Sequence, residues 1–344
     1  MRAVQLTASE TLVAREVPRP EIGPADLLVR VRAAGVCDTD LLIYQRLDVA
    51  QPLGIRPPVT LGHELAGEIV EVGARVVGFR PGDRVVAEPN VYCGECRSCR
   101  GGRPDACVRV QTIGMMRDGA FAEYVVVPAA FAHRLPDSIS FEDAGGLVEP
   151  LACAVHGCRR TNLRPGEDVL IVGDGFYGQV FTIVARALGA RRVGVFGHHA
   201  SRLEAIRSRG ADEVLDERDP GAAGMAASLG DGLGPAVVVD TVGSSASISL
   251  ALRSVAPGGR VGVFGVSELG WQIEPAVFFM LKGIDLFGLL GNPGVCPDVM
   301  ELLGTGVIDA RGLVSHVLPL EELPRAFALK AGRDPAVRKI VITP

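Results

Sequence analysis

Strands and helices alternate through the middle of the chain, and this alternation constrains the fold more than any other feature. Parallel strands need long crossover connections, and helices are the usual way to make them. The pattern therefore predicts an α/β fold built on a doubly wound parallel sheet. The runs, strand and helix in turn, are Val169–Val172, Gly178–Leu188, Arg192–Phe196, Arg202–Arg209, Ala236–Asp240, Ser247–Val255 and Arg260–Phe264.

A glycine-rich loop joins the first of these strands to the first helix. Gly173-Asp174-Gly175-Phe176-Tyr177-Gly178 has the spacing G-x-G-x-x-G between an apolar strand and an apolar helix. In that context the glycines permit a tight turn and a close approach of the backbone to a pyrophosphate, and the helix N-terminus attracts the phosphates. We predict a dinucleotide site at Gly173, Gly175, Phe176, Tyr177 and Gly178. The alternative is an ordinary strand-to-helix turn.

The end of the second strand bears on which dinucleotide is used. An NAD-binding domain of this kind places Asp or Glu about 20 residues beyond the loop, where it accepts hydrogen bonds from the ribose and repels a 2′-phosphate. Here Gly197 closes the strand, and no acid follows until Glu204. Ser201 and Arg202 can bind a phosphate. We therefore expect NADP(H) to be preferred over NAD(H), with contacts from Gly197, His198, Ser201 and Arg202. The alternative is that Gly197 only ends a strand.

The rest of the chain has a β-rich pattern. Short apolar runs such as Ala66–Val72 are separated by turn residues such as Pro81-Gly82, and the chain ends in a strand at Arg338–Ile342. At 344 residues the chain is long enough for two domains. We expect residues 1–153 and 286–344 to form a β-rich domain, and residues 154–285 to form the nucleotide-binding domain.

Four cysteines, Cys93, Cys96, Cys99 and Cys107, lie within 15 residues in a loop with no apolar period. Four thiolates in a segment without a core fit a closed tetrahedral zinc site. An iron–sulfur cluster is the alternative, but its fourth cysteine usually comes sooner and precedes proline. The sequence predicts a structural zinc.

A second group of residues could form an open metal site. Cys37 follows one strand, His63 and Glu64 begin another, and Glu149 lies in Val148-Glu149-Pro150. One thiolate, one imidazole and one carboxylate would leave a fourth zinc position open, as catalysis requires. Taken singly, Cys37 could be a buried apolar residue, and His63 could be a hydrogen-bonding partner of a carbonyl.

Composition and charge exclude several classes of protein. The net charge of −5 offers no basic patch for nucleic acid. No stretch approaches the ~18 apolar residues of a membrane span, and no signal-peptide pattern follows Met1. We expect a cytoplasmic protein that binds neither nucleic acid nor membrane.

The motifs, in order and at these spacings, resemble those of the zinc-dependent medium-chain alcohol and polyol dehydrogenases over essentially the whole chain. They are Gly35-Val36-Cys37-Asp38-Thr39-Asp40, Gly62-His63-Glu64-x-x-Gly67, Pro81-Gly82-Asp83-Arg84-Val85, the four cysteines, Gly119-Ala120-Phe121-Ala122-Glu123-Tyr124, Glu149-Pro150-Leu151, the glycine loop and Val239-Asp240-x-x-Gly243. The resemblance implies a GroES-like catalytic domain beside a Rossmann domain.

The resemblance also implies roles for individual residues. Cys37 and His63 would bind the catalytic zinc, and Glu149 would complete the site as in the sorbitol, threonine and glucose dehydrogenase branch. Cys153 is the fallback ligand. Glu64 would approach the metal or exchange with water, and Thr39 would take the substrate proton.

One position departs from the family pattern. The family often has histidine five residues after the cysteine ligand, and here that residue is Leu42. The proton would then leave through water or Glu149. His156 is more easily explained as a packing residue.

The resulting expectation is an enzyme with two zinc ions that interconverts a secondary alcohol and a ketone on a sugar, polyol, cyclitol or amino alcohol. The alternatives are a simple alcohol or aldehyde dehydrogenase, a zinc-free quinone or enoyl reductase, and a silent binding protein on the same fold. Arg260–Val266 and Asp285–Leu290 have the pattern of apolar strands at the far edge of the nucleotide sheet, and the resemblance implies that such edges pair across a two-fold axis in a homodimer or homotetramer. Tyr44, Trp271 and Phe278 are candidate pocket residues, with core packing as the alternative.

Overall fold

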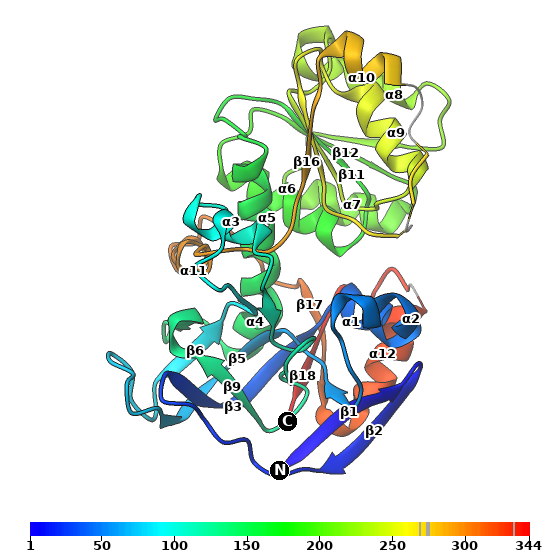
Figure 1. The fold of residues 1–344 in the computed structure, drawn as a ribbon. Helices are drawn as coiled ribbons and strands as arrows, with labels where there is room; N and C mark the ends of the chain where they lie inside the picture. The colour runs from blue at the N-terminus through cyan, green and yellow to red at the C-terminus, as the bar shows by residue number, and fades with distance from the viewer. Residues whose placement is uncertain (268–269, 273–275, 333) are drawn as a thin grey trace. The chain divides into compact units, whose positions relative to one another are not determined.

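A computed structural model describes residues 1–267, 270–272, 276–332 and 334–344, with the backbone alone at 222–223 and 276–278. The chain forms two compact units (Figure 1). Unit 1 comprises Met1–Ala152, Asn292–Gly306 and Ala310–Pro344, and unit 2 comprises Cys153–Gly291 and Val307–Asp309.

Unit 1 is rich in strands. Its strands are β1 (Arg2–Ala8), β2 (Thr11–Glu16), β3 (Asp26–Val36), β4 (Val59–Thr60), β5 (Glu64–Val72), β6 (Arg84–Ala87), β7 (Asn90–Val91), β8 (Gln111–Thr112), β9 (Tyr124–Pro128), β10 (Ala132–Arg134), β17 (Val314–Pro319) and β18 (Lys339–Thr343). Its helices and helical turns are α1 (Asp38–Gln45), α2 (Leu47–Ala50), η1 (Gln51–Leu53), α3 (Arg97–Arg100), η2 (Pro104–Ala106), η3 (Ala129–Phe131), α4 (Phe141–Asp143), the π-helical turn η4 (Ala144–Val148), α11 (Cys296–Gly304), η6 (Leu320–Glu322) and α12 (Leu323–Ala331).

The long strand β3 organises this unit. The main sheet runs β10-β6-β5-β3-β18-β17, with β9 also paired to β3, and β2-β1-β4 forms a smaller sheet. Along β3, Leu27, Val29 and Val31 point into an aliphatic core, while the side chains of Arg30 and Arg32 are exposed. This alternation is what a strand with one buried face requires. The C-terminal strand β18 pairs antiparallel with β3.

Unit 2 is a parallel sheet with helices. Its elements are β11 (Val169–Val172), α6 (Phe176–Ala187), β12 (Val193–Gly197), α7 (Ala200–Ser208), β13 (Glu213–Asp216), α8 (Ala222–Met225), η5 (Ala226–Gly232), β14 (Val237–Asp240), α9 (Ser245–Ser254), β15 (Arg260–Val263), α10 (Ala276–Lys282) and β16 (Asp285–Gly288). A further helix, α5 (Glu149–Arg160), crosses the boundary between residues 152 and 153.

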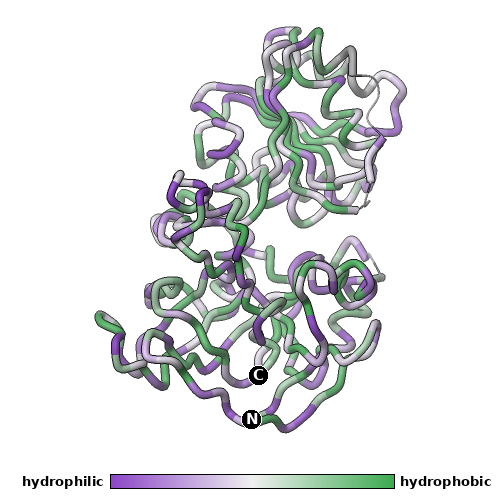
Figure 2. Tube along the Cα trace, in the orientation of Figure 1, coloured by the Kyte–Doolittle hydropathy of each residue, from purple (hydrophilic) through white to green (hydrophobic). Residues whose placement is uncertain are grey.

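The sheet of unit 2 has the order β13-β12-β11-β14-β15-β16, with all neighbours parallel. Every residue of β11 and β14 is buried, as expected for parallel strands covered on both faces. Figure 2 shows the strands at the centre of this unit in the green of hydrophobic residues. The predicted α/β class, a β-rich part plus a doubly wound parallel sheet, is confirmed.

The boundary after residue 285 differs from the sequence-based expectation. That boundary cuts β16 after its first residue, whereas β16 pairs along its length with β15 and unit 2 continues to Gly291. Backbone pairing therefore keeps the strand with the parallel sheet. Within the part of the chain that the structure describes, no helix has the length and apolar character needed to span a membrane.

Candidate functional site

Cys37, His63 and Glu64 come together because two antiparallel strands bring them there. Cys37 follows β3 and precedes α1, while His63 comes directly before β5 and Glu64 is its first residue, paired with Gly35 of β3. One ligand atom from each of the three residues lies within 4.8 Å of the others, and all three are buried. A thiol, an imidazole and a carboxyl at this separation fit a metal ion such as zinc.

The turn into α1 fixes the position of Cys37. The backbone N–H of Cys37 donates to Asp40 Oδ2 at 2.9 Å, and Asp40 Oδ1 lies 3.3 Å from His63 Nδ1. Burial alone would lower the pKa of His63, but the nearby Asp40 and Cys37 outweigh it and raise that pKa well above its ordinary value. Asp40 therefore holds the backbone of Cys37 and lies beside the imidazole of His63. The Thr39 hydroxyl lies 3.6 Å from Cys37 Sγ.

Glu64 has a buried cationic partner that sequence reasoning missed. Lys339 Nζ donates to Glu64 Oε1 at 2.7 Å and to Oε2 at 2.9 Å, and both side chains are almost fully buried. Burial alone would lower the pKa of Lys339, but Glu64 outweighs it and the net pKa is raised. A side chain at Gly35 would collide with the Glu64 carboxylate, so the glycine makes room for this pair.

Glu149 is not part of the Cys37–His63–Glu64 group as the structure describes it. It opens α5 directly after the π-helical turn η4 and is buried, and Asn292 Nδ2 donates to its Oε1 at 3.3 Å. Cys153, the alternative ligand, lies one turn further along α5. The structure thus brings three of the four predicted residues together as one group, and Glu149 contacts Asn292.

The four-cysteine lobe, residues 93–107, has the dimensions of a tetrahedral zinc site. Sγ–Sγ distances are 3.5 Å for Cys96–Cys99 and Cys93–Cys107, and 4.0 Å for Cys93–Cys99. Zn–S bonds of about 2.3 Å imply S–S separations of about 3.8 Å. Thiolates bound to different irons of a cluster would lie farther apart. Backbone N–H groups of Glu95 and Cys96 lower the pKa of Cys93 to about 6, which favours the thiolate.

The glycine loop has the shape of a phosphate-binding turn. A side chain at Gly173 (φ 115°) would contact Thr241, and one at Gly178 would collide with the Gly173 carbonyl. A side chain at Gly175 would meet no described atom within 4 Å. That open space lies at the N-terminus of the 12-residue helix α6, where phosphates bind favourably. The Tyr177 ring packs on Phe264 at 4.5 Å.

The turn after β12 donates hydrogen bonds to a carboxylate that sequence reasoning also missed. Asp174, inside the glycine loop, accepts hydrogen bonds at Oδ2 from the backbone N–H of His198 (2.9 Å) and of His199 (2.7 Å). An added Cβ at Gly197 would come within 2.7 Å of Asp174 Oδ2. The room that Gly197 leaves is therefore filled by Asp174. Ser201 is exposed in the first turn of α7.

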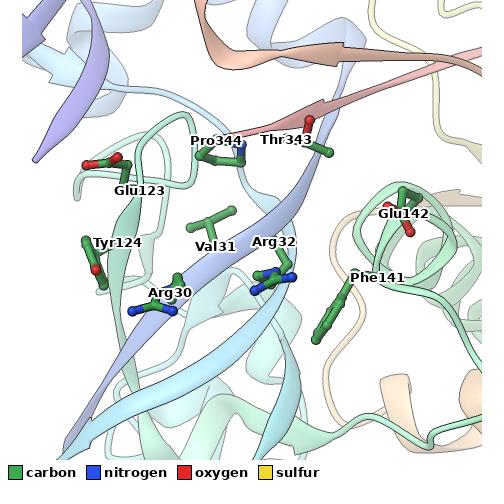
Figure 3. Close-up of a pocket in the computed structure, with 9 residues that line it drawn as sticks. All are labelled: Arg30, Val31, Arg32, Glu123, Tyr124, Phe141, Glu142, Thr343 and Pro344. Atoms are coloured by element: carbon green, nitrogen blue, oxygen red, sulfur yellow. The ribbon is translucent and has the colours of Figure 1, made fainter. Parts of the chain in front are cut away.

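Other cavities and candidate residues lie apart from this chemistry. A pocket of about 450 Å³ in unit 1, lined by Arg30, Arg32, Tyr124 and Phe141 among others, contains none of the predicted site residues (Figure 3). Tyr44 packs edge-on against Phe327, and Trp271 Nε1 donates to the Gly243 carbonyl at 3.3 Å. The side chain of Phe278 lies outside the described residues.

Comparison with known proteins agrees with this geometry. Residues 23–137 match the model of the alcohol dehydrogenase GroES-like domain, and residues 178–305 match that of the zinc-binding dehydrogenases. Sorbitol dehydrogenase of Bacillus subtilis (strain 168) is 32% identical over 95% of this chain and 92% of its own length. L-threonine 3-dehydrogenase of Salmonella gallinarum is 33% identical over 96% of each chain.

A solved structure described as a zinc-binding dehydrogenase from Sinorhizobium meliloti 1021, bound to NADP, is 32% identical to this chain. It superimposes with a TM-score of 0.90 over 100% of this chain and 99% of its own. Because both family models and relatives matched over nearly the whole chain agree, the chain belongs to the zinc-dependent medium-chain alcohol and polyol dehydrogenases, a family of oxidoreductases.

Proposed function

We propose that this enzyme interconverts a secondary alcohol and a ketone on a polar substrate, namely a sugar, polyol, cyclitol or amino alcohol, with a nicotinamide cofactor. The observation that carries the proposal is the buried group of Cys37, His63 and Glu64. The similarity to enzymes named for sorbitol and threonine supports a polar substrate. A silent relative or a zinc-free reductase would have no need for a buried thiol and imidazole beside a carboxylate.

Cys37 and His63 would hold the catalytic zinc, with Glu149 as the third ligand. The charge of Glu64 is already balanced by Lys339, which favours Glu149 for that position. Bound zinc is a Lewis acid and would lower the pKa of an alcohol substrate. Thr39, two residues after Cys37, would accept the substrate proton at its hydroxyl oxygen. Leu42 cannot pass that proton on, so water or Glu149 would do so.

A second zinc would be bound by Cys93, Cys96, Cys99 and Cys107. All four positions would be filled by protein, so this ion would stabilise the lobe and take no part in the reaction. The expected content is two zinc ions per chain.

The cofactor would be held by Gly173, Gly175, Phe176, Tyr177 and Gly178, and we propose that NADP(H) is preferred. β12 ends in Gly197 without an acid, and His198, Ser201 and Arg202 follow it along the chain. Similarity to a zinc-binding dehydrogenase bound to NADP supports this. Comparing kcat/KM with the two cofactors tests the preference, and a higher value with NAD would refute it. Arg202→Ala should weaken NADP binding selectively.

The catalytic assignment is tested by Cys37→Ser, with Cys158→Ala as a control. Cys158 is buried but lies in neither metal-ligand group. Elemental analysis should find one zinc in Cys37→Ser and two in the control, and circular dichroism should show that both are folded. Cofactor reduction should be lost only in Cys37→Ser, and full turnover there would refute the assignment.

The substrate class is tested with the wild-type enzyme. Cofactor reduction is measured against a panel of sugars, polyols, cyclitols and amino alcohols, with simple primary alcohols alongside. A clear preference for the simple alcohols would refute the polar-substrate proposal.

A further inference from the structure

Asp174 lies where two neighbouring strands of the parallel sheet end. β11 and β12 are paired, with Val172 opposite Phe196, so the loop after β11 and the turn after β12 run side by side. Asp174 belongs to the first and His198 and His199 to the second. The Asp174 side chain is only 6% exposed, and its Oδ2 accepts the N–H groups of both histidines. Contacts that join the two turns therefore converge on one carboxylate.

This carboxylate is ionised near neutral pH. Burial alone would raise its pKa, but the backbone N–H groups of His199 and His198 and the His199 ring outweigh burial and lower it. His199 Nδ1 lies 3.0 Å from Oδ2, and a guanidinium nitrogen of Arg202 lies 3.6 Å from Oδ1. Asp174 thus engages both the turn and the arginine that could bind a phosphate.

The position of the carboxylate matters because of what binds there in this architecture. In a doubly wound nucleotide-binding domain, the adenosine ribose lies beside the end of the second strand, here β12. The acidic side chain that hydrogen-bonds to the ribose normally comes from the end of that strand. At Gly197 the first atom of such a side chain would fall within 2.7 Å of Asp174 Oδ2. The glycine loop therefore supplies a negative charge where β12 supplies none.

We propose that Asp174 is a specificity-determining residue of the cofactor site, which disfavours the 2′-phosphate of NADP(H). It does so by adding a negative charge beside that phosphate, by engaging Arg202, and by occupying two backbone N–H groups next to the start of α7. The inference rests on cofactor binding at this end of unit 2, as proposed above. Selectivity is then a balance in which Arg202 and Ser201 attract the phosphate and Asp174 opposes it.

The test is direct binding, measured by calorimetry, of adenosine 2′,5′-bisphosphate and of 5′-AMP. These ligands differ only in the 2′-phosphate, and neither requires turnover. Asp174→Asn removes the charge while keeping the shape of the side chain. For this variant, the ratio of the affinity for the bisphosphate to the affinity for 5′-AMP should be about tenfold or more higher than in the wild type. Removing a charge within a few ångströms of a phosphate changes the binding free energy by more than about 1.4 kcal/mol, which is a tenfold change in affinity.

Glu204→Gln is the matched control. It removes the same charge from an exposed side chain of α7 that pairs with Arg207, and its ratio should stay at the wild-type value. Asp174→Ser, which keeps an oxygen acceptor without charge, replaces Asp174→Asn if that variant unfolds. Asp174→Asn combined with Arg202→Ala should lose part of the gain, because the arginine is then no longer available to bind the phosphate.

An unchanged or lower ratio in the uncharged variants would overturn the inference. A lower ratio would mean that Asp174 holds the turn in a shape that binds the phosphate. The outcome is separable from that of the cofactor proposal. If the wild type binds 5′-AMP better than the bisphosphate, the proposed NADP(H) preference is wrong. The role of Asp174 is still tested, because it depends only on whether the ratio of affinities is higher in Asp174→Asn than in the wild type.

Discussion

At the scale of single residues, we expect a substitution in the buried pair of Lys339 and Glu64 to lower the stability of the fold strongly. Lys339→Met would leave the Glu64 carboxylate buried without its cation, beside Cys37 and His63. Breaking a buried pair from one side costs about 3–5 kcal/mol. We expect a fall of that size in the free energy of unfolding, measured by urea denaturation, together with a loss of bound zinc on dialysis.

The double variant Glu64→Gln/Lys339→Met, compared with the two single variants, measures the interaction between the two side chains. It contains no uncompensated charge, so it should be more stable than Lys339→Met alone. If the effects of the two single substitutions simply add in the double variant, the two side chains do not act as a pair.

The buried Asp168 leads to a second prediction at this scale, which concerns the dependence of stability on pH. Burial alone would raise its pKa, but hydrogen bonds from Arg191, the Gly230 N–H and Arg192 lower it. In the unfolded chain the pKa of Asp168 is about 3.9, so the unfolded state takes up the proton first as the pH falls. The stabilisation is present above pH ~4 and is lost as the pH falls below that value towards the lower folded pKa.

Asp168→Asn should accordingly lower the free energy of unfolding by about 1.5–3 kcal/mol at pH 7, and the difference from the wild type should shrink below pH ~4. Urea denaturation at a series of pH values measures both effects. Asp231→Asn is the control, because Asp231 also pairs with Arg191 but is 79% exposed. A difference that stays constant from pH 7 to pH 3 would contradict the assignment.

Sequence motifs predicted the candidate site residues that lie close together along the chain. Cys37-x-Thr39, His63-Glu64 and the glycine loop each depend on neighbours within a few positions, so a single sequence contains the signal. Lys339 contacts Glu64 across 275 positions, and Asp174 contacts His199 across 25. Nothing in the pattern around Lys339 marks it as buried, because only the pairing of β18 with β3 brings it there.

At the scale of elements, the strands of the parallel sheet are set by their local sequence, whereas those of the β-rich unit depend on pairing with distant parts of the chain. β11 has the predicted bounds because it is buried on both faces and ends at a glycine loop. β3 contains the short apolar run Leu27–Val31 and extends beyond it to Val36. The apolar run is interrupted by Arg32, which is exposed, and the strand continues because β5 and β18 pair with it beyond that point. Such pairing cannot be read from local periodicity.

The four-cysteine lobe is an element whose order should depend on its metal. Of the four cysteines, only Cys107 is buried, and several arginines, among them Arg97, Arg100 and Arg109, lie in or beside the lobe. Cys96→Ser should lose one of two zinc ions and leave the lobe without a core. Trypsin should then cut at these arginines much faster than in the wild type, as mass spectrometry of the fragments would show.

Cys37→Ser is the natural comparison for this experiment, because it should lose the other zinc while the lobe stays resistant to trypsin. Two zinc ions in Cys96→Ser, or an unchanged cleavage pattern, would show that the lobe is not held by metal.

At the scale of the whole molecule, β16 raises the question of what covers the edge of the parallel sheet. It is the last strand in the described order, and an unpaired edge can pair with a second chain. Apolar side chains on and near it are exposed: Leu286 is 37% exposed, Leu290 70%, Met280 77% and Leu281 80%. We infer that a second copy of the chain covers this edge about a two-fold axis, giving a homodimer or a homotetramer.

Light scattering should therefore give a mass of about 72 kDa or about 144 kDa at micromolar concentration, two or four times the 36.1 kDa of the chain. Leu286→Glu combined with Leu290→Glu places two charges where the inferred interface would exclude water, and charged residues are depleted at the centre of such interfaces. The variant should shift towards the monomer mass. Val77→Glu, at a 91% exposed position in unit 1, should leave the assembly intact. A wild-type mass near 36 kDa, or a double variant that assembles like the wild type, would place the interface elsewhere or rule it out.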